Sequence, residues 1–592
     1  MSYIINQPIC SGCHRCRVEC PVGAIRFKNA KYWIDPDKCI SCGHCETVCH
    51  NEAISNADAP VVSAAPHTPT QLTCDVLVVG AGASGLSAAA QAAEAGKKVL
   101  VIEKGKEIGG SAWYAHVFRS LWSKWHEEAG LNDPRDIVYK QFMKQTDGSV
   151  NPKLVRRILD ADEEFVNWLI EKHDLAKDFT FGPQPFGGYG ITAAYDWKYN
   201  HKRIDTTIGP GGIGWWMCTK LLSIVEANGG KVLYHTPAKE LLTDENGNIT
   251  GVVAEDEGGK VIISCKACVL SSGAFTRSRE LMAKFQPAFY DDGDGDGVHV
   301  FTHPNCTGDG ISMSEAIGAD VDYHNRRVGM FGPMRHPFGT VSIAASGASA
   351  FDVDREGNLY VDVFGMGEVS NLAKVPGRFV WGIADEADVE AAVKHSMGRA
   401  PDVPGIDMDA LYRNWREELE TELSWETMYK ADTLEELAEK LHIAPEKLLA
   451  AKAQSEEAAK SPAGGPPMDP PAMDPNDRMN WSITELLEGK RSDAPGGWGP
   501  MVKSTLGKGP YYAIYKKMFH ENALGGLVID ENTSVLRGGR PIPGLYATGD
   551  GTRGIMMPGA VGVGFIEGTI SALTFALTSG YIAGREAASY AE

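Results

Sequence analysis

Residues 75–105, DVLVVGAGASGLSAAAQAAEAGKKVLVIEKG, hold the clearest structural signal in the chain. Two apolar runs flank an alanine-rich stretch, which predicts a buried strand, a helix and a second buried strand. Gly80, Gly82 and Gly85 lie between the first strand and the helix, where they allow a tight turn, close approach of the backbone to a pyrophosphate, and close helix packing. Glu103 ends the second strand, at the place of an acid that binds a ribose hydroxyl. A GxGxxG motif alone is weak evidence for a fold. With a strand before it, a helix after it and an acid at the end of the next strand, it predicts a Rossmann-like, dinucleotide-binding α/β fold.

Four further motifs follow in order along the chain. They are IGGSAWYAH from Ile108, VLSSGAF at 269–275, TGDGISMSEAIGA at 307–319 and GLYATGD at 544–550. On these motifs the chain, from about residue 74 to its end, resembles the flavoprotein subunit family of fumarate reductase and succinate dehydrogenase. That family also includes soluble enoate reductases and 3-ketosteroid dehydrogenases.

The resemblance implies FAD rather than NAD as the bound dinucleotide. Non-covalent binding is expected, because His116 is a histidine in the right neighbourhood but no clear anchor for a histidyl linkage. The helix after the last glycines is expected to direct its positive N-terminus at the flavin. The residues expected to contact FAD are Gly80, Gly82, Ala83, Ser84, Gly85, Glu103, Lys104, Gly109, Gly110, Ser111, Gly273, Asp309, Gly549, Asp550, Gly559, Val561 and Gly562.

The same resemblance implies an FAD-binding domain interrupted by an α+β capping domain. The first part of the FAD-binding domain is expected at 74–320, the capping domain with a Pro-rich loop at 321–500, and the return at 501–592. The loop contains KSPAGGPPMDPPAMDPNDR, which is too rich in proline for a helix or a sheet core. A stretch rich in Pro, Ala, Ser and Thr at 57–73 predicts a linker to a small α+β domain at 1–56.

The first fifty residues carry eight cysteines in two runs of one spacing. The runs are Cys10, Cys13, Cys16, Cys20 and Cys39, Cys42, Cys45, Cys49. C-x2-C-x2-C supplies three thiolates to a cubane cluster, and the fourth comes from elsewhere. Two zinc sites are the alternative, but structural zinc usually takes two ligand pairs separated by a longer loop. The spacing therefore favours iron and electron transfer.

This small domain resembles a bacterial ferredoxin, in which the last cysteine of each run serves the opposite cluster. The resemblance implies two [4Fe-4S] clusters. One would be bound by Cys10, Cys13, Cys16 and Cys49, and the other by Cys39, Cys42, Cys45 and Cys20. One departure is His50, which stands where the first run has Pro21.

Composition sets the class of protein. The chain has 592 residues, which exceeds what one core normally supports, and a formal charge of −20, which argues against nucleic-acid binding.

The chain starts with MSYIINQPIC, without the pattern of a signal peptide, so a cytoplasmic location is expected. The apolar stretch at 561–584 is broken by Glu567 and glycines and is not expected to span a membrane. The remaining cysteines, Cys74, Cys218, Cys265, Cys268 and Cys306, are expected to be reduced thiols.

This chain differs from the fumarate-reducing members of the family at the positions of their substrate-binding residues. By alignment with the family, Gly367 replaces the proton-donating arginine, Asn522 replaces one histidine, Ala560 replaces a second arginine, and the other histidine falls near Met330. A buried carboxylate without a guanidinium partner is costly. Fumarate is therefore an unexpected substrate.

An apolar pocket is expected instead. Its candidate lining residues are Trp113, Tyr114, Met556 and Met557, although such side chains more often serve packing. Candidate catalytic residues are His520, Arg553, Tyr114, Tyr512 and Asn522, the first four as proton donors and the last as a group that holds a carbonyl or carboxylate. A purely structural role is equally open for His520 and Arg553.

Two other patterns are assigned no site. Cys265 and Cys268 form a C-x2-C in the expected strand IISCKACVL, without a partner pair for zinc. DDGDGDG at 291–297 begins like a calcium loop, but His303 stands where the glutamate ligand should be.

The sequence predicts an FAD- and iron–sulfur-dependent oxidoreductase. The leading hypothesis is reduction of an activated C=C bond, in an enone or enoate of apolar or steroid-like character. No second unit of the strand–GxGxxG–helix kind seen at 75–105 is recognised, so the expected electron donor is an external ferredoxin, flavodoxin or flavoprotein reductase. One alternative is a dehydrogenase similar to 3-ketosteroid dehydrogenase that exports electrons through the clusters, and another is an electron-transfer subunit of a larger complex.

Overall fold

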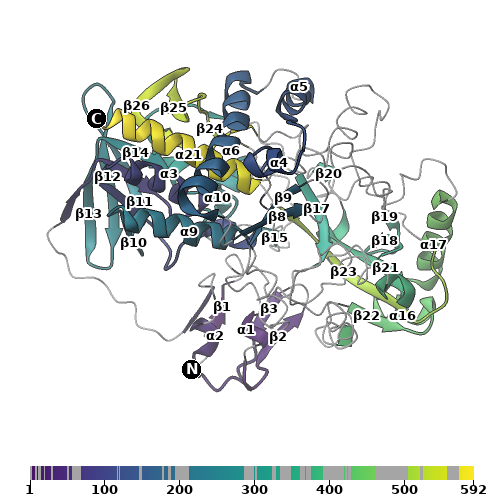
Figure 1. Cartoon of the computed structure of the whole chain (residues 1–592). Coiled ribbons are helices and arrows are strands. Elements are labelled where there is room, and N and C mark those ends of the chain that lie inside the picture. The colour runs from purple at the N-terminus through teal and green to yellow at the C-terminus, as the bar shows by residue number, and fades with distance from the viewer. Residues whose placement is uncertain are drawn as a thin grey trace.

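The computed structural model describes most of the chain and arranges it around two large sheets with a small N-terminal domain below them (Figure 1). The residues described are 3–6, 10, 15–18, 20–28, 31–47, 49, 53–56, 69–115, 118, 120–145, 150–175, 179–183, 189–193, 213–285, 299–300, 303, 305–322, 328–333, 349–360, 367–368, 375–390, 419–420, 423, 428–459, 505–520, 525–555 and 572–592.

The N-terminal domain consists of short strands and one-turn helices. Strand β1 pairs antiparallel with β4, and β2 forms a hairpin with β3. Its buried centre is Ile25 and Tyr32, against which cysteine side chains of both runs pack. Among the described residues of this domain the buried apolar side chains are small or few, namely Ala24, Ile25, Tyr32, Ala53 and Ile54, so the domain needs bound groups to hold it together. The elements are β1 (Tyr3–Ile5), α1 (Arg15–Val18), β2 (Ile25–Lys28), β3 (Lys31–Ile34), α2 (His44–Thr47) and β4 (Ile54–Asn56).

The first large sheet has the strand order β10-β7-β6-β14-β26-β25 among the described residues. All its pairings are parallel except that of β25 with β26. Every residue of β6, β7 and β14 is buried, as expected for parallel strands covered on both faces. The strands are β6 (Val76–Val79), β7 (Val99–Ile102), β10 (Lys231–Leu233), β14 (Ala267–Leu270), β25 (Ser534–Arg537) and β26 (Arg540–Ala547).

Helices α3, α6, α9 and α21 pack around this sheet, and α21 lies directly on α3 (Figure 1). Glycines make that approach possible, because a Cβ on Gly580 would lie 2.1 Å from the carbonyl oxygen of Ser84. The helices here are α3 (Ala83–Glu94), α4 (Lys124–Glu128), α5 (Arg135–Gln145), α6 (Pro152–His173), α9 (Ile213–Ala227), α10 (Arg279–Phe285), α11 (Asp309–Ala316) and α21 (Ala572–Tyr590), with short 3-10 turns η1 (Gly110–Tyr114) and η4 (Gly549–Gly551).

A smaller sheet has the order β11-β12-β13-β5. Strand β5 is Thr70–Thr73, so the last residues of the predicted linker are a paired strand, parallel to β13. The expectation of one strand through Cys265 and Cys268 was wrong, because the chain leaves β13 at Ser264 and starts β14, in the first large sheet, at Ala267. The elements are β11 (Ala238–Thr243), β12 (Ile249–Asp256) and β13 (Gly259–Ser264). Elsewhere two antiparallel pairs join β8 (Phe179–Pro183) with β9 (Tyr189–Ala193) and β16 (Val321–Asp322) with β24 (Gly526–Leu527).

The second large sheet has the order β19-β18-β21-β23-β17-β20, and β15 and β22 also pair with β23. One face packs against α16 and α17 through buried residues such as Trp381 and Leu437. Its central strand, β23, is Tyr511–His520, so this sheet extends beyond the range 321–500 expected for the inserted domain. The elements are β15 (His299–Val300), β17 (Val328–Pro333), β18 (Phe351–Asp354), β19 (Leu359–Tyr360), β20 (Gly367–Glu368), η3 (Pro376–Arg378), β21 (Phe379–Asp385), β22 (Met428–Ala431), α16 (Leu434–Lys440) and α17 (Pro445–Ala459).

Of the helices that the structure describes, none combines the length and the apolar character needed to cross a membrane.

Candidate functional site

The glycine turn after β6 has the geometry that its sequence predicts. Gly80 has φ +107°, and a Cβ there would lie 2.4 Å from the carbonyl oxygen of Ser271 on the neighbouring strand. Gly85 is in the first turn of α3, where a Cβ would lie 1.9 Å from the carbonyl oxygen of Gly80. Gly82, at the N-cap of α3, provides no side-chain cap for the first turn. The free N–H groups of that turn and the missing side chains suit a phosphate, so the turn fits a dinucleotide.

Glu103 joins this turn to the next segment. Its carboxylate accepts hydrogen bonds from the backbone N–H of Ala81 at 2.8 Å and of Gly105 at 2.7 Å. The N–H of Gly109 donates to the carbonyl oxygen of Ala81 at 2.9 Å. The Gly109–Gly110 pair is therefore fixed beside the glycine turn, as the order of the motifs predicts, and η1 continues to Tyr114.

Lys104 is held by the start of α11. Its Nζ donates to Asp309 Oδ2 at 2.7 Å and also to the hydroxyl of Thr307, which itself donates to Asp309. The structure therefore brings together two residues that sequence analysis assigned to FAD from motifs some two hundred positions apart. This arrangement makes Lys104 and Asp309 a structural pair, and direct contact of either with FAD stays a prediction.

A second group of predicted FAD contacts gathers around Ser111. Its hydroxyl accepts a hydrogen bond from the N–H of His303 at 3.0 Å and lies 3.3 Å from Cys306 Sγ. Burial raises the pKa of Cys306, and the nearby carboxylate of Asp550 raises it further. Burial also raises the pKa of Asp550 itself, to about 6.

Cys306 is a neighbour of this site that sequence analysis did not single out. It was grouped with the reduced thiols, although its position directly before the TGDG motif was a signal for it. A Cβ on Gly273, another predicted FAD contact, would lie 3.1 Å from its sulfur. Gly559, Val561 and Gly562 lie outside the described residues.

The candidate catalytic residues do not all meet at one place. Tyr512 and His520 are at opposite ends of β23, about 27 Å apart at the usual rise per residue. Tyr512 is fully buried, with the Lys430 ammonium 5.5 Å from its ring centre. Arg553 is ion-paired through Nε to Asp322 Oδ2 at 2.9 Å. Tyr512 and His520 therefore cannot both serve one substrate atom.

His520 shares a row of the second sheet with a position that family comparison singled out. Gly329 of β17 is opposite His520 of β23 on one side and opposite Gly367 of β20 on the other. Adjacent strands are about 4.8 Å apart, so His520 and Gly367 are separated by about 10 Å across the sheet. Met330, next to Gly329, is opposite Phe519.

Several other predicted positions fall on undescribed parts. Asn522, Met556, Met557 and Ala560 lie outside the described residues. The same holds for the side chains of Trp113 and Tyr114, whose backbone is in η1, and for the side chain of His520, whose backbone is in β23.

The cysteines of the N-terminal domain lie around its small core in a repeated pattern. The N–H of Ala24 donates to Cys20 Sγ at 3.3 Å, and the N–H of Ala53 donates to Cys49 Sγ at the same distance of 3.3 Å. Equal bonds at the ends of both runs indicate two similar halves. N–H groups directed at sulfur are also how proteins tune iron–sulfur sites.

One set of thiols is close enough to interact electrostatically. Burial, together with the nearby thiols of Cys39, Cys42 and Cys20, raises the pKa of Cys45 to about 11. These are the four cysteines that the crossed arrangement assigns to one cluster. In the described residues, which exclude Cys13, no three metal-binding side chains are already gathered at coordinating distance. The donor set of thiols still fits an iron–sulfur cluster, whose own atoms span the space between its ligands.

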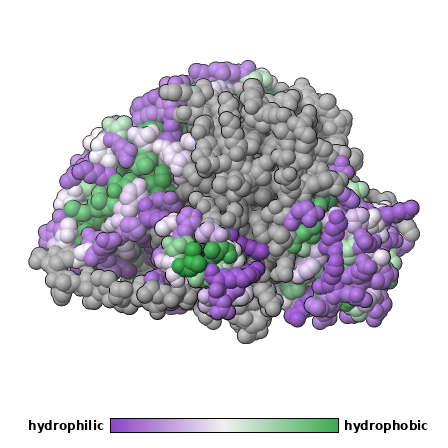
Figure 2. Space-filling model, turned by 90° about the horizontal axis from the view of Figure 1, so that it is seen from below, coloured by the Kyte–Doolittle hydropathy of each residue, from purple (hydrophilic) through white to green (hydrophobic). Residues whose placement is uncertain are grey.

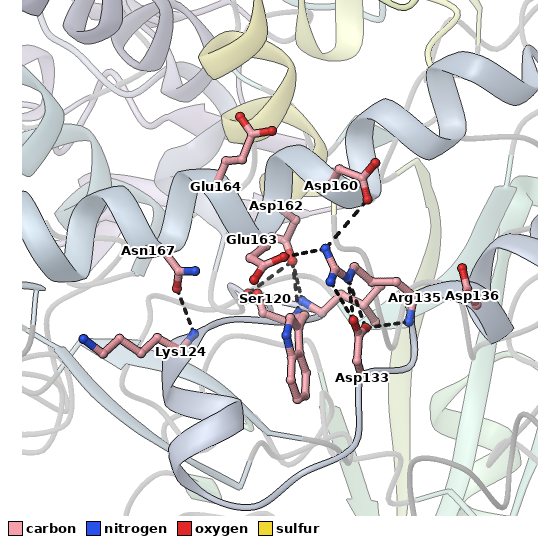
Figure 3. A network of polar contacts seen from close by, with 12 residues as sticks. Ser120, Lys124, Asp133, Arg135, Asp136, Asp160, Asp162, Glu163, Glu164 and Asn167 are labelled. Atoms are coloured by element: carbon pink, nitrogen blue, oxygen red, sulfur yellow. Dashed lines mark hydrogen bonds and ion pairs between the residues drawn. The ribbon is translucent and has the colours of Figure 1, made fainter.

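A buried polar network holds the segment that follows the GG-S motif (Figure 3). Asp162 of α6 accepts hydrogen bonds from the N–H of Leu121 at 2.6 Å and the hydroxyl of Ser120 at 3.1 Å. Arg135 lies beside it, ion-paired with Asp133 at 2.6 Å and also with Glu163. The network fixes residues 120–122 onto α6 and so limits the path of the chain beyond η1.

Comparison with known families covers nearly the whole chain. The model of a family described as "FAD binding domain" matches residues 75–564, and one described as "4Fe-4S dicluster domain" matches residues 9–54.

Three curated relatives represent the similar sequences. A fumarate reductase (cytochrome) from Shewanella frigidimarina is 24% identical over 90% of this chain and 79% of its own length. A vinyl phenol reductase from Lactiplantibacillus plantarum is 23% identical over 87% of this chain and 96% of its own length. An NADH:fumarate oxidoreductase from Klebsiella pneumoniae is 28% identical, but the match covers 41% of this chain and only 24% of that protein.

Two solved structures share the fold. The open conformation of a flavocytochrome c3 fumarate reductase aligns with a TM-score of 0.61 at 22% identity, over 88% of this chain and 79% of that one. A 3-ketosteroid delta1-dehydrogenase from Sterolibacterium denitrificans aligns with a TM-score of 0.59 at 19% identity, over 87% of this chain and 99% of that one.

Proposed function

Since the chain belongs to the FAD binding domain family and carries a 4Fe-4S dicluster domain, we propose that it is a reductase of activated carbon–carbon double bonds. When bound, FAD would supply hydride to the β-carbon of the double bond, and two clusters would supply the electrons one at a time from an external carrier protein. The names of two relatives, a fumarate reductase and a vinyl phenol reductase, agree with this reaction class.

The protein supplies the binding sites for these groups. The glycine turn at Gly80–Gly85 and the Gly109–Ser111 segment would hold FAD without a covalent bond. The two cysteine runs would hold the clusters, and the last cysteine of each run would bind the cluster of the other run. A capping role for the second sheet is part of the same proposal.

His520 is the proposed proton donor to the α-carbon. The observation that carries this assignment is the row His520–Gly329–Gly367, because Gly367 stands where the fumarate-reducing relatives are expected to have their proton-donating arginine. Glycine cannot donate a proton from a side chain, whereas a histidine, which stands two strands away in the same row, is a residue type that can. Tyr512 is disfavoured by its full burial beside Lys430 at the far end of β23.

The proposed substrate is an apolar enone or enoate rather than fumarate. Replacement of two expected arginines by Gly367 and Ala560 removes the bidentate partners that a dicarboxylate needs. Arg553 is already paired with Asp322, so it does not restore them.

The test is anaerobic reoxidation of the dithionite-reduced protein by a panel of enones, enoates and fumarate. Apolar enones should reoxidise it and fumarate should not. His520→Gln should slow reoxidation by about 100-fold or more, the usual contribution of a general acid, whereas the matched Tyr512→Phe on the same strand should not. No reoxidation by any enone, or equal rates in both variants, would contradict the proposal. Reduction of the oxidised protein by a saturated ketone would favour the dehydrogenase alternative instead.

A further inference from the structure

A short loop, residues 103–109, contacts both the N-terminal domain and the glycine turn. Lys106 Nζ donates a hydrogen bond to the carbonyl oxygen of Cys49 at 3.3 Å. Lys106 is in the loop between Glu103, which binds Ala81, and Gly109, which also binds Ala81. Cys49 is therefore tied through one side chain to the loop that lies against the FAD-binding turn.

The loop itself is well fixed. The N–H of His235 donates to the carbonyl oxygen of Gly105 at 3.0 Å, and the N–H of Thr236 donates to the carbonyl oxygen of Glu103 at 2.8 Å. Lys106 thus projects from a backbone that is held on both sides.

The other predicted site has one cysteine that faces solvent. Cys42 is exposed, and its neighbour Ile40 has 61% of its surface exposed. Figure 2, which looks at the molecule from the side of the N-terminal domain, shows a compact hydrophobic area near the centre of that face. Exposed apolar residues of the N-terminal domain are Ile4, Val22, Trp33 and Ile40. The two predicted cluster sites therefore differ, one lying toward the FAD-binding loop and one toward water.

We propose that Lys106 makes the Cys49 site the one nearer FAD and raises the reduction potential of the cluster bound there relative to the cluster bound by Cys20, Cys39, Cys42 and Cys45. A cluster gains negative charge when it is reduced, and a nearby ammonium group stabilises that state. The exposed Lys106 acts partly through solvent, so salt should weaken the effect. The inference rests on the proposed use of both sites for electron transfer, and it gives that transfer a direction, from the Cys42 side to the Cys49 side.

The test is an anaerobic redox titration of the full-length holoprotein, followed by electron paramagnetic resonance. In Lys106→Met, one of two cluster potentials should become more negative while the other stays unchanged, and the shift should shrink at high salt. Lys106→Arg should keep the wild-type potential, because it keeps the charge and a donor. Lys239→Met is the control. Lys239 is an exposed lysine on β11 of the smaller sheet, where it pairs with Glu255 of β12 at 3.3 Å.

The outcomes separate the two proposals. Two potentials that are both unchanged in Lys106→Met would overturn the inference alone. A shift in Lys106→Met, together with a wild-type protein that reduces no double bond, would overturn the proposed function and leave the inference standing. A holoprotein in which both clusters have the same potential would overturn the inference and leave the proposed function to the reoxidation assay.

Discussion

Replacing Asp162 by asparagine should remove a pH-dependent cost from the folded state. Asp162 is fully buried in α6, where its Oδ2 accepts the hydrogen bonds from Leu121 and Ser120 (Figure 3). Burial raises its pKa from the usual 3.8 to about 7, and the hydrogen bonds from Leu121, Trp122 and Ser120 offset only part of that effect.

The direction in which stability changes with pH follows from the number of protons that the folded and unfolded states bind. Between pH 3.8 and about 7 the folded protein holds a proton on Asp162 that the unfolded chain has lost, so stability falls as pH rises through this range. At 1.36 kcal/mol per pH unit, the difference is on the order of 4 kcal/mol above pH 7. Stability from this group is therefore greatest in acid and is lost toward neutral pH.

Asp162→Asn keeps a carbonyl oxygen as acceptor for Leu121 and cannot ionise. The amide nitrogen of the asparagine would replace Asp162 Oδ1, which is buried without a hydrogen-bond partner. The unpaired amide would lower the stability of the variant by the same amount at every pH. The free energy of unfolding of the variant minus that of the wild type should therefore increase by about 3 kcal/mol between pH 5 and pH 8.

Urea unfolding of the full chain at pH 5, 6, 7 and 8, followed by far-UV circular dichroism, measures this difference. Asp160→Asn is the matched control, because Asp160 is also in α6 and beside Arg135 at 3.7 Å but has 44% of its side chain exposed. Parallel pH profiles for wild type and Asp162→Asn would refute the reasoning, whatever the absolute stabilities.

Three further results are expected. Gly85→Ala should yield insoluble or FAD-free protein, because its Cβ would lie 1.9 Å from a backbone oxygen of the turn and overpacking of this kind costs about 3 kcal/mol or more; a variant with normal flavin absorbance would contradict the packing. Cys20→Ala and Cys45→Ala should eliminate the same cluster signal and leave about four of eight irons, while Cys49→Ala eliminates the other, and loss of different signals in the first two would disprove the crossed ligand set. Cys306 should react with iodoacetamide much more slowly in the native protein than in urea, because burial raises its pKa; equal rates would show that the thiol is accessible.

Local spacing was sufficient to predict the glycine turn. The roles of Gly80 and Gly85 depend on contacts within a few residues and on the neighbouring strand, so a motif of six residues carries them. The same holds for Glu103, which closes a unit of thirty residues. The family match over residues 75–564 confirms the resemblance drawn from the later motifs.

Long-range pairing was beyond the same reasoning. GPYYAIYKK was assigned to the returning FAD-binding domain, yet β23 takes its partners from β17, β21 and β22, whose residues lie far from it in sequence. Cys265 and Cys268 were assigned to one strand because nothing local marks Lys266 as a crossing between two sheets. Lys106 and Asp162 were not singled out, because their roles come from partners 57 and 41 residues away.

The central strand of the second sheet connects the N-terminal domain to the proposed site. Tyr515 of β23 packs against Ile25 and Tyr32, and His520 follows five residues later on the same strand, about 17 Å along it. Within the part of the chain that the structure describes, Lys106 on the FAD-binding side and Tyr515 on the second sheet both contact the N-terminal domain. In the proposed capping role of the second sheet, a movement of β23 would therefore also act on the contact between Tyr515 and the N-terminal domain.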